Sequence, residues 1–229
     1  MRVYMSVLEI RWVFFLLLLI SCKDLDEAQI GSGTDYQPLG LGAVWEYKVL
    51  ETNYFGESDQ ETNQFFYKDS IASQYFNEVG EQVFLVHRMR SDDRRAWGQD
   101  KVFAYRVSKN TLIRTVDNVA IACLVFPPSD GQRWDGNIYS ALPENIFSLE
   151  LYEKYPVGGQ DFNMTAKVVQ SEEDDRITLR DNRFEVYAKG VGLVESYYEV
   201  LSYCTRNDCV GEQIISTGRF VHLELIGHG

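Results

Sequence analysis

The residues of this chain that could do chemistry are few and widely spaced. The side chains suited to nucleophilic or metal chemistry are four cysteines and three histidines, at Cys22, Cys123, Cys204, Cys209, His87, His222 and His228. No histidine has a partner at a metal-binding spacing such as His-Glu-x-x-His, and the sequence has no Gly-x-Ser-x-Gly, P-loop or Ser-x-x-Lys motif. We therefore predict no catalytic residue, no metal site and no cofactor, and we expect that the protein is not an enzyme.

Carboxylates are abundant, but their spacing does not indicate a hydrolase. Adjacent pairs fall in polar, turn-like segments, at Asp92-Asp93, Glu172-Glu173 and Asp174-Asp175. Glycoside hydrolysis needs two carboxylates that face each other across a cleft, and neighbours in a turn do not provide that arrangement. Asp130, Asp135 and Asn137 could ligate calcium, yet their order differs from an EF-hand loop and is typical of turn caps.

Cys204 and Cys209 enclose a polar tetrapeptide between two strand-like segments. A disulfide between them would close a hairpin tip in an oxidising compartment. The alternative is a zinc site, which would need a second pair of ligands that this part of the sequence lacks. Cys123 lies within the apolar segment 119–125, where a thiol is expected to act as a small core residue.

An apolar segment near the N-terminus has the features of a secretory signal. Trp12 to Ile20 are nine consecutive apolar residues, whereas a membrane-spanning helix needs about 20. Arg2 and Arg11 precede this segment and small Ser21 follows it. This arrangement of positive, apolar and small residues predicts a signal peptide over residues 1–21.

The end of that segment, Leu19-Ile20-Ser21-Cys22, resembles a bacterial lipobox. The resemblance implies cleavage before Cys22 and attachment of long acyl chains, such as palmitate, to this residue. Each buried acyl CH₂ contributes about 0.8 kcal/mol, so two or three chains suffice for stable membrane anchoring. The alternative is an ordinary signal peptide that is cleaved elsewhere, with Cys22 incidental.

The residues after Cys22 bear on the destination of the chain. Lys23 stands where an aspartate would resemble an inner-membrane retention signal, so the outer membrane is favoured. The acidic cluster Asp24, Asp26 and Glu27 resembles the export signal of some Bacteroidota lipoproteins, which leaves both the periplasmic face and the cell surface open. The formal net charge of −12 works against nucleic acid as a partner.

Strand patterns follow a short linker. Residues 22–37 are rich in acidic residues, Gly and Ser and predict a lipidated cysteine with a flexible tether. From Pro38 onward the dominant pattern has period two, and it recurs throughout residues 38–229 between polar turns. Residues 143–154 fit a strand better than a helix. The pattern predicts one mostly β domain, an antiparallel sheet with one packed face and little or no helix.

Two segments, 36–45 and 126–134, share an aromatic residue, Pro, Gly and then Trp. They raise the alternative of two sheet halves that meet near residue 127. Together with segments 155–162 and 187–194, whose second carries Gly-Val-Gly-Leu-Val, they resemble motifs of largely uncharacterised Bacteroidota lipoproteins. That resemblance implies a curved antiparallel sheet, either a half-barrel or barrel-like, and no catalytic residues accompany it.

These patterns favour a noncatalytic, membrane-anchored β-domain that binds an unknown ligand or an envelope protein. The alternatives are a structural or accessory subunit of an envelope complex and a hydrolase of unrecognised type. Trp45 and Trp134 are predicted to pack in the core. Trp97 lies in a charged loop, where we expect it to be exposed and available for ligand contact.

Overall fold

Alternating apolar and polar residues form twelve strands in the computed structural model, which describes residues 34–229. The strand bounds are Val44–Gly56 (β1), Asp59–Phe76 (β2), Gln82–Ser91 (β3), Gly98–Ser108 (β4), Thr111–Val116 (β5), Val119–Val125 (β6), Arg133–Asp135 (β7), Ile146–Val157 (β8), Gln160–Asp174 (β9), Leu179–Ala188 (β10), Gly192–Tyr203 (β11) and Ile215–His228 (β12). In this part of the chain the only helix is a 3-10 turn, η1, at Thr34–Tyr36. Residues 143–154, for which a helix was the competing prediction, contribute to strand β8.

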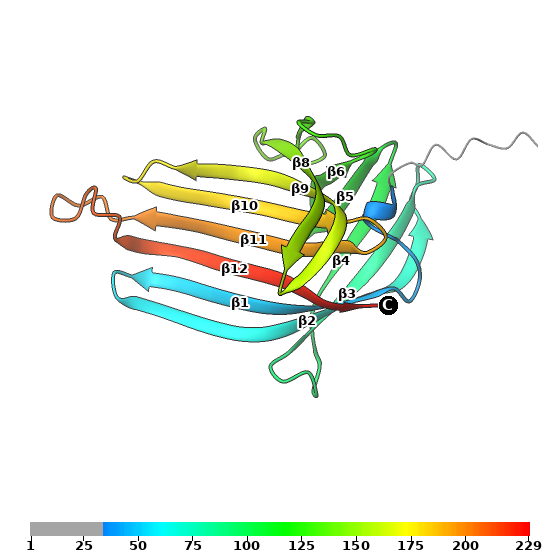
Figure 1. Cartoon of the computed structure of the whole chain (residues 1–229), viewed down its shortest axis with the longest axis horizontal. Coiled ribbons are helices and arrows are strands. Elements are labelled where there is room, and N and C mark those ends of the chain that lie inside the picture. The colour runs from blue at the N-terminus through cyan, green and yellow to red at the C-terminus, as the bar shows by residue number, and fades with distance from the viewer. Residues whose placement is uncertain (1–33) are drawn as a thin grey trace, which may run out of the picture. The chain divides into compact units, whose positions relative to one another are not determined.

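All twelve strands belong to one antiparallel sheet with the order β6-β5-β4-β3-β2-β1-β12-β11-β10-β9-β8-β7. The first and last strands pair in the middle of the sheet, so each half is a meander of consecutive strands (Figure 1). The connection between β6 and β7 links the two edge strands of the sheet. The two segments that share Pro, Gly and Trp therefore precede the first strand of each half.

The two edges approach each other at a seam between β6 and β7. The Ala122 backbone N–H donates to the Gly136 carbonyl over 2.8 Å, and the Trp134 indole donates to the Ala122 carbonyl over 2.8 Å. Gly136 is required there because a Cβ would stand 2.3 Å from the ring of Phe147. The sheet is thus nearly closed, which confirms the predicted mostly β, curved and barrel-like fold.

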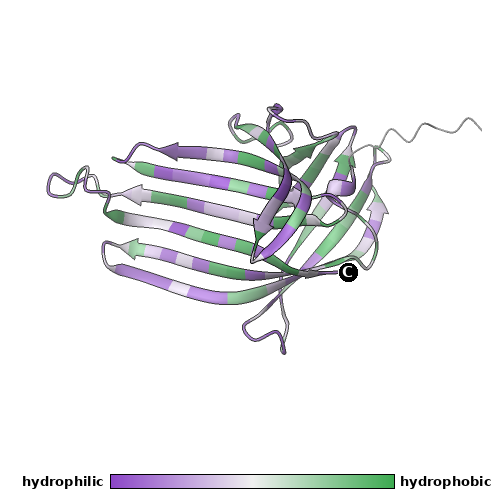
Figure 2. Cartoon of the chain, in the orientation of Figure 1, coloured by the Kyte–Doolittle hydropathy of each residue, from purple (hydrophilic) through white to green (hydrophobic). Residues whose placement is uncertain are grey.

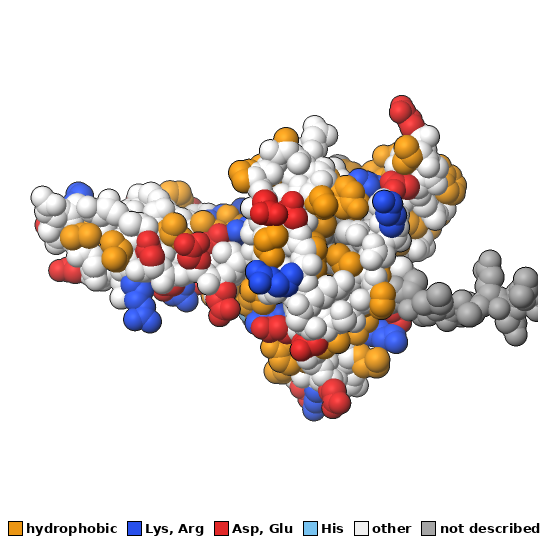
Figure 3. All heavy atoms as spheres, turned by 90° about the horizontal axis from the view of Figure 1, so that it is seen from above, with side chains coloured by type: hydrophobic (Ala, Val, Ile, Leu, Met, Phe, Trp, Pro, Cys, Tyr) orange, Lys and Arg blue, Asp and Glu red, His pale blue; other side chains and the backbone are white. Residues whose placement is uncertain are grey.

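The two regions of the sheet differ in what covers them. In the body, the inner faces of the two halves enclose a core that includes Trp45, Tyr47 and Val49. Beyond the body, six strands continue with the turns that join them, at residues 52–62, 172–182 and 199–220. We call this part of the sheet the extension. It projects from the body as a single layer (Figures 1 and 3).

The sequence motifs at residues 36–45 and 187–194 pack against each other. The Trp45 indole donates to the Val191 carbonyl over 2.6 Å, and the Leu193 backbone N–H donates to Gln37 Oε1 over 3.1 Å. Gly192 has a φ of +107°, and a Cβ there would lie 3.0 Å from both Gln37 and Trp45. Trp45 is 4% exposed, so its predicted core role is confirmed. The motifs are therefore structural.

Residues 34–37 correct one predicted boundary. Tyr36 is 9% exposed and Gln37 is 4% exposed, because both pack against the body. The tether predicted for residues 22–37 was therefore too long at its C-terminal end. The signal peptide, Cys22 and the rest of the tether lie outside the described residues. Among residues 34–229, no helix has the length and apolarity that a membrane crossing requires.

Candidate binding cavity

A cavity lies on the inner face of the sheet, between strands β3 to β5 and strands β10 to β12. Its volume is about 200 Å³. Its lining combines three cations and one carboxylate with apolar walls: Arg88, Lys101, Arg114, Glu185, Ser196, Phe103, Val116, Leu193 and Leu223. The strands supply these side chains because alternate residues of a strand point to the same face.

Arg88 is held by a bidentate ion pair. Its Nε and Nη2 donate to the two carboxylate oxygens of Asp69, each over 2.7 Å. Its guanidinium also lies 4.4 Å from the ring centroid of Tyr67 and 5.2 Å from that of Phe103. Such planar bidentate pairing fixes both orientation and charge. Arg88 is thus positioned at the cavity with its charge neutralised by Asp69.

Arg114 on β5 and Glu185 on β10 form an ion pair that joins the two halves of the sheet. Arg114 Nη2 donates to Glu185 Oε1 over 2.7 Å, and the Tyr187 hydroxyl donates to the other carboxylate oxygen over 2.6 Å. Burial, and then the Glu185 charge, raise the pKa of Tyr187 well above its usual value. Tyr187 therefore stays protonated and can donate, so Glu185 is satisfied on both oxygens.

Lys101 is the third cation and has no comparable partner. Its Nζ lies 3.9 Å from Asp117 Oδ2, and the two side chains are 42% and 82% exposed. An exposed pair at that separation contributes little because water screens it. Lys101 therefore brings a nearly uncompensated positive charge to the edge of the cavity.

Cys123 lies behind this network and fits its predicted core role. It is fully buried. Burial, as the dominant cause, raises the pKa of its thiol to about 11. A protonated, enclosed thiol is a poor nucleophile.

A second polar cluster lies on the face of strands β11 and β12 that is opposite to the cavity. His222 Nε2 is 2.7 Å from Glu195 Oε1. Tyr197 stacks on Phe184 with ring centroids 5.1 Å apart and an interplanar angle of 3°. The second oxygen of Glu195 is buried and, among the described residues, has no hydrogen-bond partner. His222 is partly packed, with its ring centroid 5.6 Å from that of Tyr197.

The residues singled out from the sequence lie away from the cavity lining. Trp97, in the loop between β3 and β4, is half-buried rather than exposed, and Lys68 Nζ lies 4.5 Å from its ring centroid. Lys68 is itself fixed by an ion pair of 2.7 Å with Glu46. A ligand contact at Trp97 stays a prediction. Trp134 is half-buried and packs against the core.

The remaining candidates are turn residues. Cys204 and Cys209 form a disulfide near the free end of the extension, with their Cα atoms 5.8 Å apart. Asp135 Oδ1 accepts hydrogen bonds from the backbone N–H groups of Asn137 and Asn145, over 2.9 and 3.0 Å. Asp130 caps the backbone of Leu151 over 3.0 Å. Asp135 therefore caps a turn, and Asp130 accepts a hydrogen bond from the backbone of strand β8.

The cavity residues were not found from the sequence, although a signal was present. Arg114 lies two residues from both Leu112 and Val116, which share its face of the strand. Lys101 lies two residues before Phe103 and therefore shares its face. Period two therefore places these cations among inward-facing apolar residues. Charged residues at inward positions are the informative exception in such a pattern.

Comparisons with known proteins add two solved structures. No family model matches the chain, and no curated protein matches it. One structure is a protein described as exported and as having a YmcC-like fold, from Bacteroides fragilis NCTC 9343, with 11% identity and a TM-score of 0.41 over 84% of this chain and 98% of that one. The other, described as a lipoprotein, is from Parabacteroides distasonis ATCC 8503, with 10% identity and a TM-score of 0.40 over 83% and 98%.

Proposed function

We propose that this protein is a noncatalytic binding protein that a lipid on Cys22 holds at the outer membrane, and that the cavity on the inner face is its ligand site. The cavity of about 200 Å³ with its charged lining carries the proposal. Buried side chains such as Tyr47, Val49 and Leu112 form the core of the body.

The charged lining supports a binding role because it is unfavourable for stability alone. Burial of charged groups carries a desolvation penalty, and well-packed apolar residues of similar volume are often neutral or stabilising by 1–4 kcal/mol in their place, as a rough guide. Arg114 and Glu185 nevertheless meet inside the body, with side-chain exposures of 20% and 5%. A ligand that uses these charges accounts for their presence.

The size and chemistry of the cavity do not fit a lipid carrier. Sites for drug-sized ligands typically enclose roughly 300–1,000 Å³ and are mostly apolar. This cavity is smaller, and four of its lining residues are charged: Arg88, Lys101, Arg114 and Glu185. A long acyl chain would have no apolar channel to occupy. The ligand is therefore a small molecule.

Recovery of the ligand from the native protein tests the binding role. The protein would be purified from its own membranes, denatured, and the released small molecules identified by mass spectrometry. In a Ser196→Phe variant the new ring occupies the cavity, and we expect the released compound to disappear. Ser73→Phe, at an exposed position of β2, is the matched control. Identical extracts from both variants and the wild type would count against the cavity as the site.

The anchor has a separate test. The lipobox-like sequence that ends at Cys22 supports it. We expect acyl label on the wild-type protein and none on Cys22→Ala. Protease treatment of intact cells would then separate the periplasmic face from the cell surface. An unlabelled wild-type protein would refute the anchor.

A second candidate function is an accessory subunit that uses the extension to bind another envelope protein. The single-layer extension favours it, because an uncovered sheet leaves side chains such as Phe55, 60% exposed, available on the surface. A photocrosslinking residue at position 55 should give one adduct of defined mass in cells. The same residue at Lys109, in an exposed turn of the body, should not.

A further inference from the structure

We infer that the cavity takes a small organic anion, a carboxylate with a compact apolar body, whose charged end contacts Lys101 and Arg114. This inference rests on the proposed binding role and adds the chemical class of the ligand. It follows from the charges, the walls and the size of the cavity.

The charge balance points to an anion. Asp69 is paired with Arg88 through two hydrogen bonds. Glu185 is paired with Arg114 and also accepts a hydrogen bond from Tyr187. Two carboxylates therefore match two of the three cations, and the charge of Lys101 remains. Its contact with Asp117, 3.9 Å long, lies at the exposed edge, so an anion in the cavity would be the stronger partner.

The apolar walls distinguish an organic anion from an inorganic one. Phe103, Leu193 and Leu223 are 5%, 4% and 7% exposed and line the cavity beside the cations. Inorganic phosphate could use the cations but would leave these walls in contact with water. A carboxylate that carries a ring or short chain would satisfy both, because burial of its apolar body against the walls is favourable.

The volume limits the apolar body. Water occupies about 30 Å³ per molecule in the liquid, so a cavity of about 200 Å³ corresponds to a small number of waters. That space suits a single aromatic ring with its carboxylate, and it excludes a nucleotide or an acyl chain. The acidic exterior, with a formal net charge of −12, repels anions at long range. Selection of an anion must therefore come from these local cations.

Calorimetric titration of the purified full-length protein tests the inference with three probes. Benzoate carries the charge and the ring, benzamide has the same shape without the charge, and inorganic phosphate has charge without the ring. We expect benzoate to bind at least about tenfold more tightly than either other probe, since hydrogen bonds to charged groups contribute more than neutral ones. Added salt should weaken benzoate binding more than benzamide binding.

Substitutions at Lys101 locate the charge. Lys101→Met should weaken benzoate binding about tenfold and leave benzamide unchanged, while Lys101→Arg should retain most of the benzoate affinity. Lys48→Met, at an exposed position on the outer face of β1, is the matched control and should bind as the wild type does. Ser196→Phe should abolish binding of all three probes. Thermal unfolding of each variant confirms that it is folded.

The outcomes separate this inference from the proposed function. Equal binding of benzoate and benzamide, or an unchanged benzoate affinity in Lys101→Met, would overturn the anion assignment while the cavity remained a ligand site. Failure of every probe to bind would also overturn it. If, in addition, the native protein released no small molecule, the binding role itself would be refuted.

Discussion

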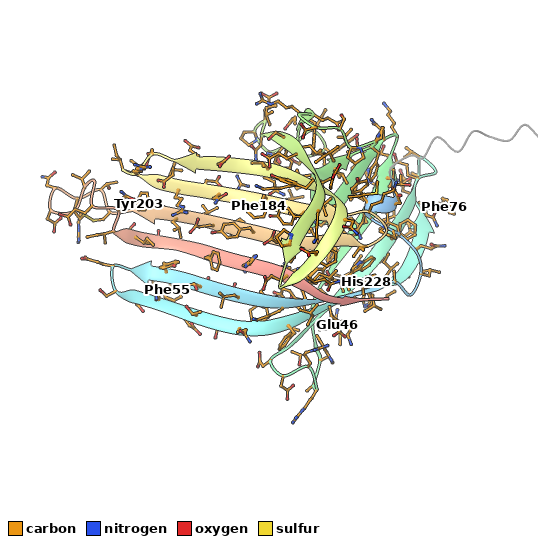
Figure 4. The ribbon with its side chains drawn as sticks, in the orientation of Figure 1. Glu46, Phe55, Phe76, Phe184, Tyr203 and His228 are labelled. Carbon is orange, nitrogen blue, oxygen red and sulfur yellow. A yellow bond between two sulfur atoms is a disulfide. The ribbon has the colours of Figure 1, made fainter. Side chains whose placement is uncertain are left out.

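The body and the extension are parts of one sheet, but the inner face of this sheet is covered in the body and uncovered in the extension. In the body, the two halves cover each other and bury side chains such as Leu112 and Val168 completely. In the extension, residues 59–62 of β2 are exposed throughout, and hydrophilic residues predominate there (Figure 2). Phe55 and Tyr203 mark its free end, with Phe76 at the opposite end of the domain (Figure 4). One strand pattern thus builds both an enclosed interior and a two-faced surface.

The ion pairs of the two regions differ in how deeply they are buried. Arg114 and Glu185 in the body have side-chain exposures of 20% and 5%, whereas Arg180 and Glu199 in the extension have exposures of 40% and 13%. Removal of one partner from a buried pair leaves a desolvated charge, while a partly exposed pair is screened by water. The same chemistry should therefore be critical in the body and nearly dispensable in the extension.

The largest expected effect tests this contrast directly. Glu185→Gln leaves Arg114 inside the body without its counter-ion and should lower the free energy of unfolding by about 3–5 kcal/mol. Glu199→Gln, the matched change in the extension, should lower it by at most about 1 kcal/mol. Urea unfolding measures both values. Equal losses would mean that burial does not separate the two regions.

Truncation of leucine gives the next effect. Leu112→Ala removes a fully buried side chain from the body and should cost about 2–5 kcal/mol, because the cavity that it leaves cannot collapse completely. Leu50 lies on β1 and is 38% exposed, so Leu50→Ala should cost less than about 1 kcal/mol. Thermal unfolding compares the two. A large loss of stability in Leu50→Ala would indicate that a partner or a second layer covers the face of β1 on which Leu50 lies.

The fold was largely predictable because it depends on local patterns. Period two identified strands such as β1, and polar turns separated them, so an antiparallel, curved, mostly β domain followed. The pairing of β1 with β12 did not follow, since it joins residues such as Trp45 and His228 from opposite ends of the chain. Nor did the packing of residues 34–37, whose composition is typical of a linker but whose contacts are long-range.

The cavity was not predictable to the same degree. Each of its residues has an ordinary neighbourhood, and the site exists only because β5 and β10 face each other across the body. The ion pair of Arg114 with Glu185 spans 71 positions of the sequence. Sequence patterns show that these charges point inward, but only the closure of the sheet shows which ones meet.

The disulfide at the free end of the extension should have a smaller effect. Closure of a loop with a sequence separation of 5 stabilises a protein by about 2 kcal/mol in the chain-entropy description. A Cys204→Ser, Cys209→Ser double variant should therefore lose at most this amount. Hydrogen exchange should rise at residues 199–220 and stay unchanged in the body. Faster exchange at Leu112 would show that the two regions unfold as one cooperative unit.

The smallest effect at neutral pH concerns Cys123, the free cysteine of the described residues. Because Cys123 is enclosed in the body, the rate at which it is alkylated reports how often the body opens. In a Cys22→Ala background, iodoacetamide at pH 8 should leave native Cys123 unmodified and should modify it fully in urea, because alkylation requires an exposed thiolate. Modification of the native protein at the rate of a free peptide thiol would show that the body opens readily.

The same thiol gives the stability of the body a pH dependence in the alkaline range. Burial raises the pKa of Cys123 from about 9.0 to about 11, so between these values the unfolded chain releases the proton and the folded chain keeps it. The stabilising contribution is therefore complete below pH 9 and is lost as the pH rises toward 11. Cys123→Ala should be less stable at neutral pH but should lose less stability over this interval. Parallel curves for the two proteins would show that the thiol is already ionised or solvated in the folded body.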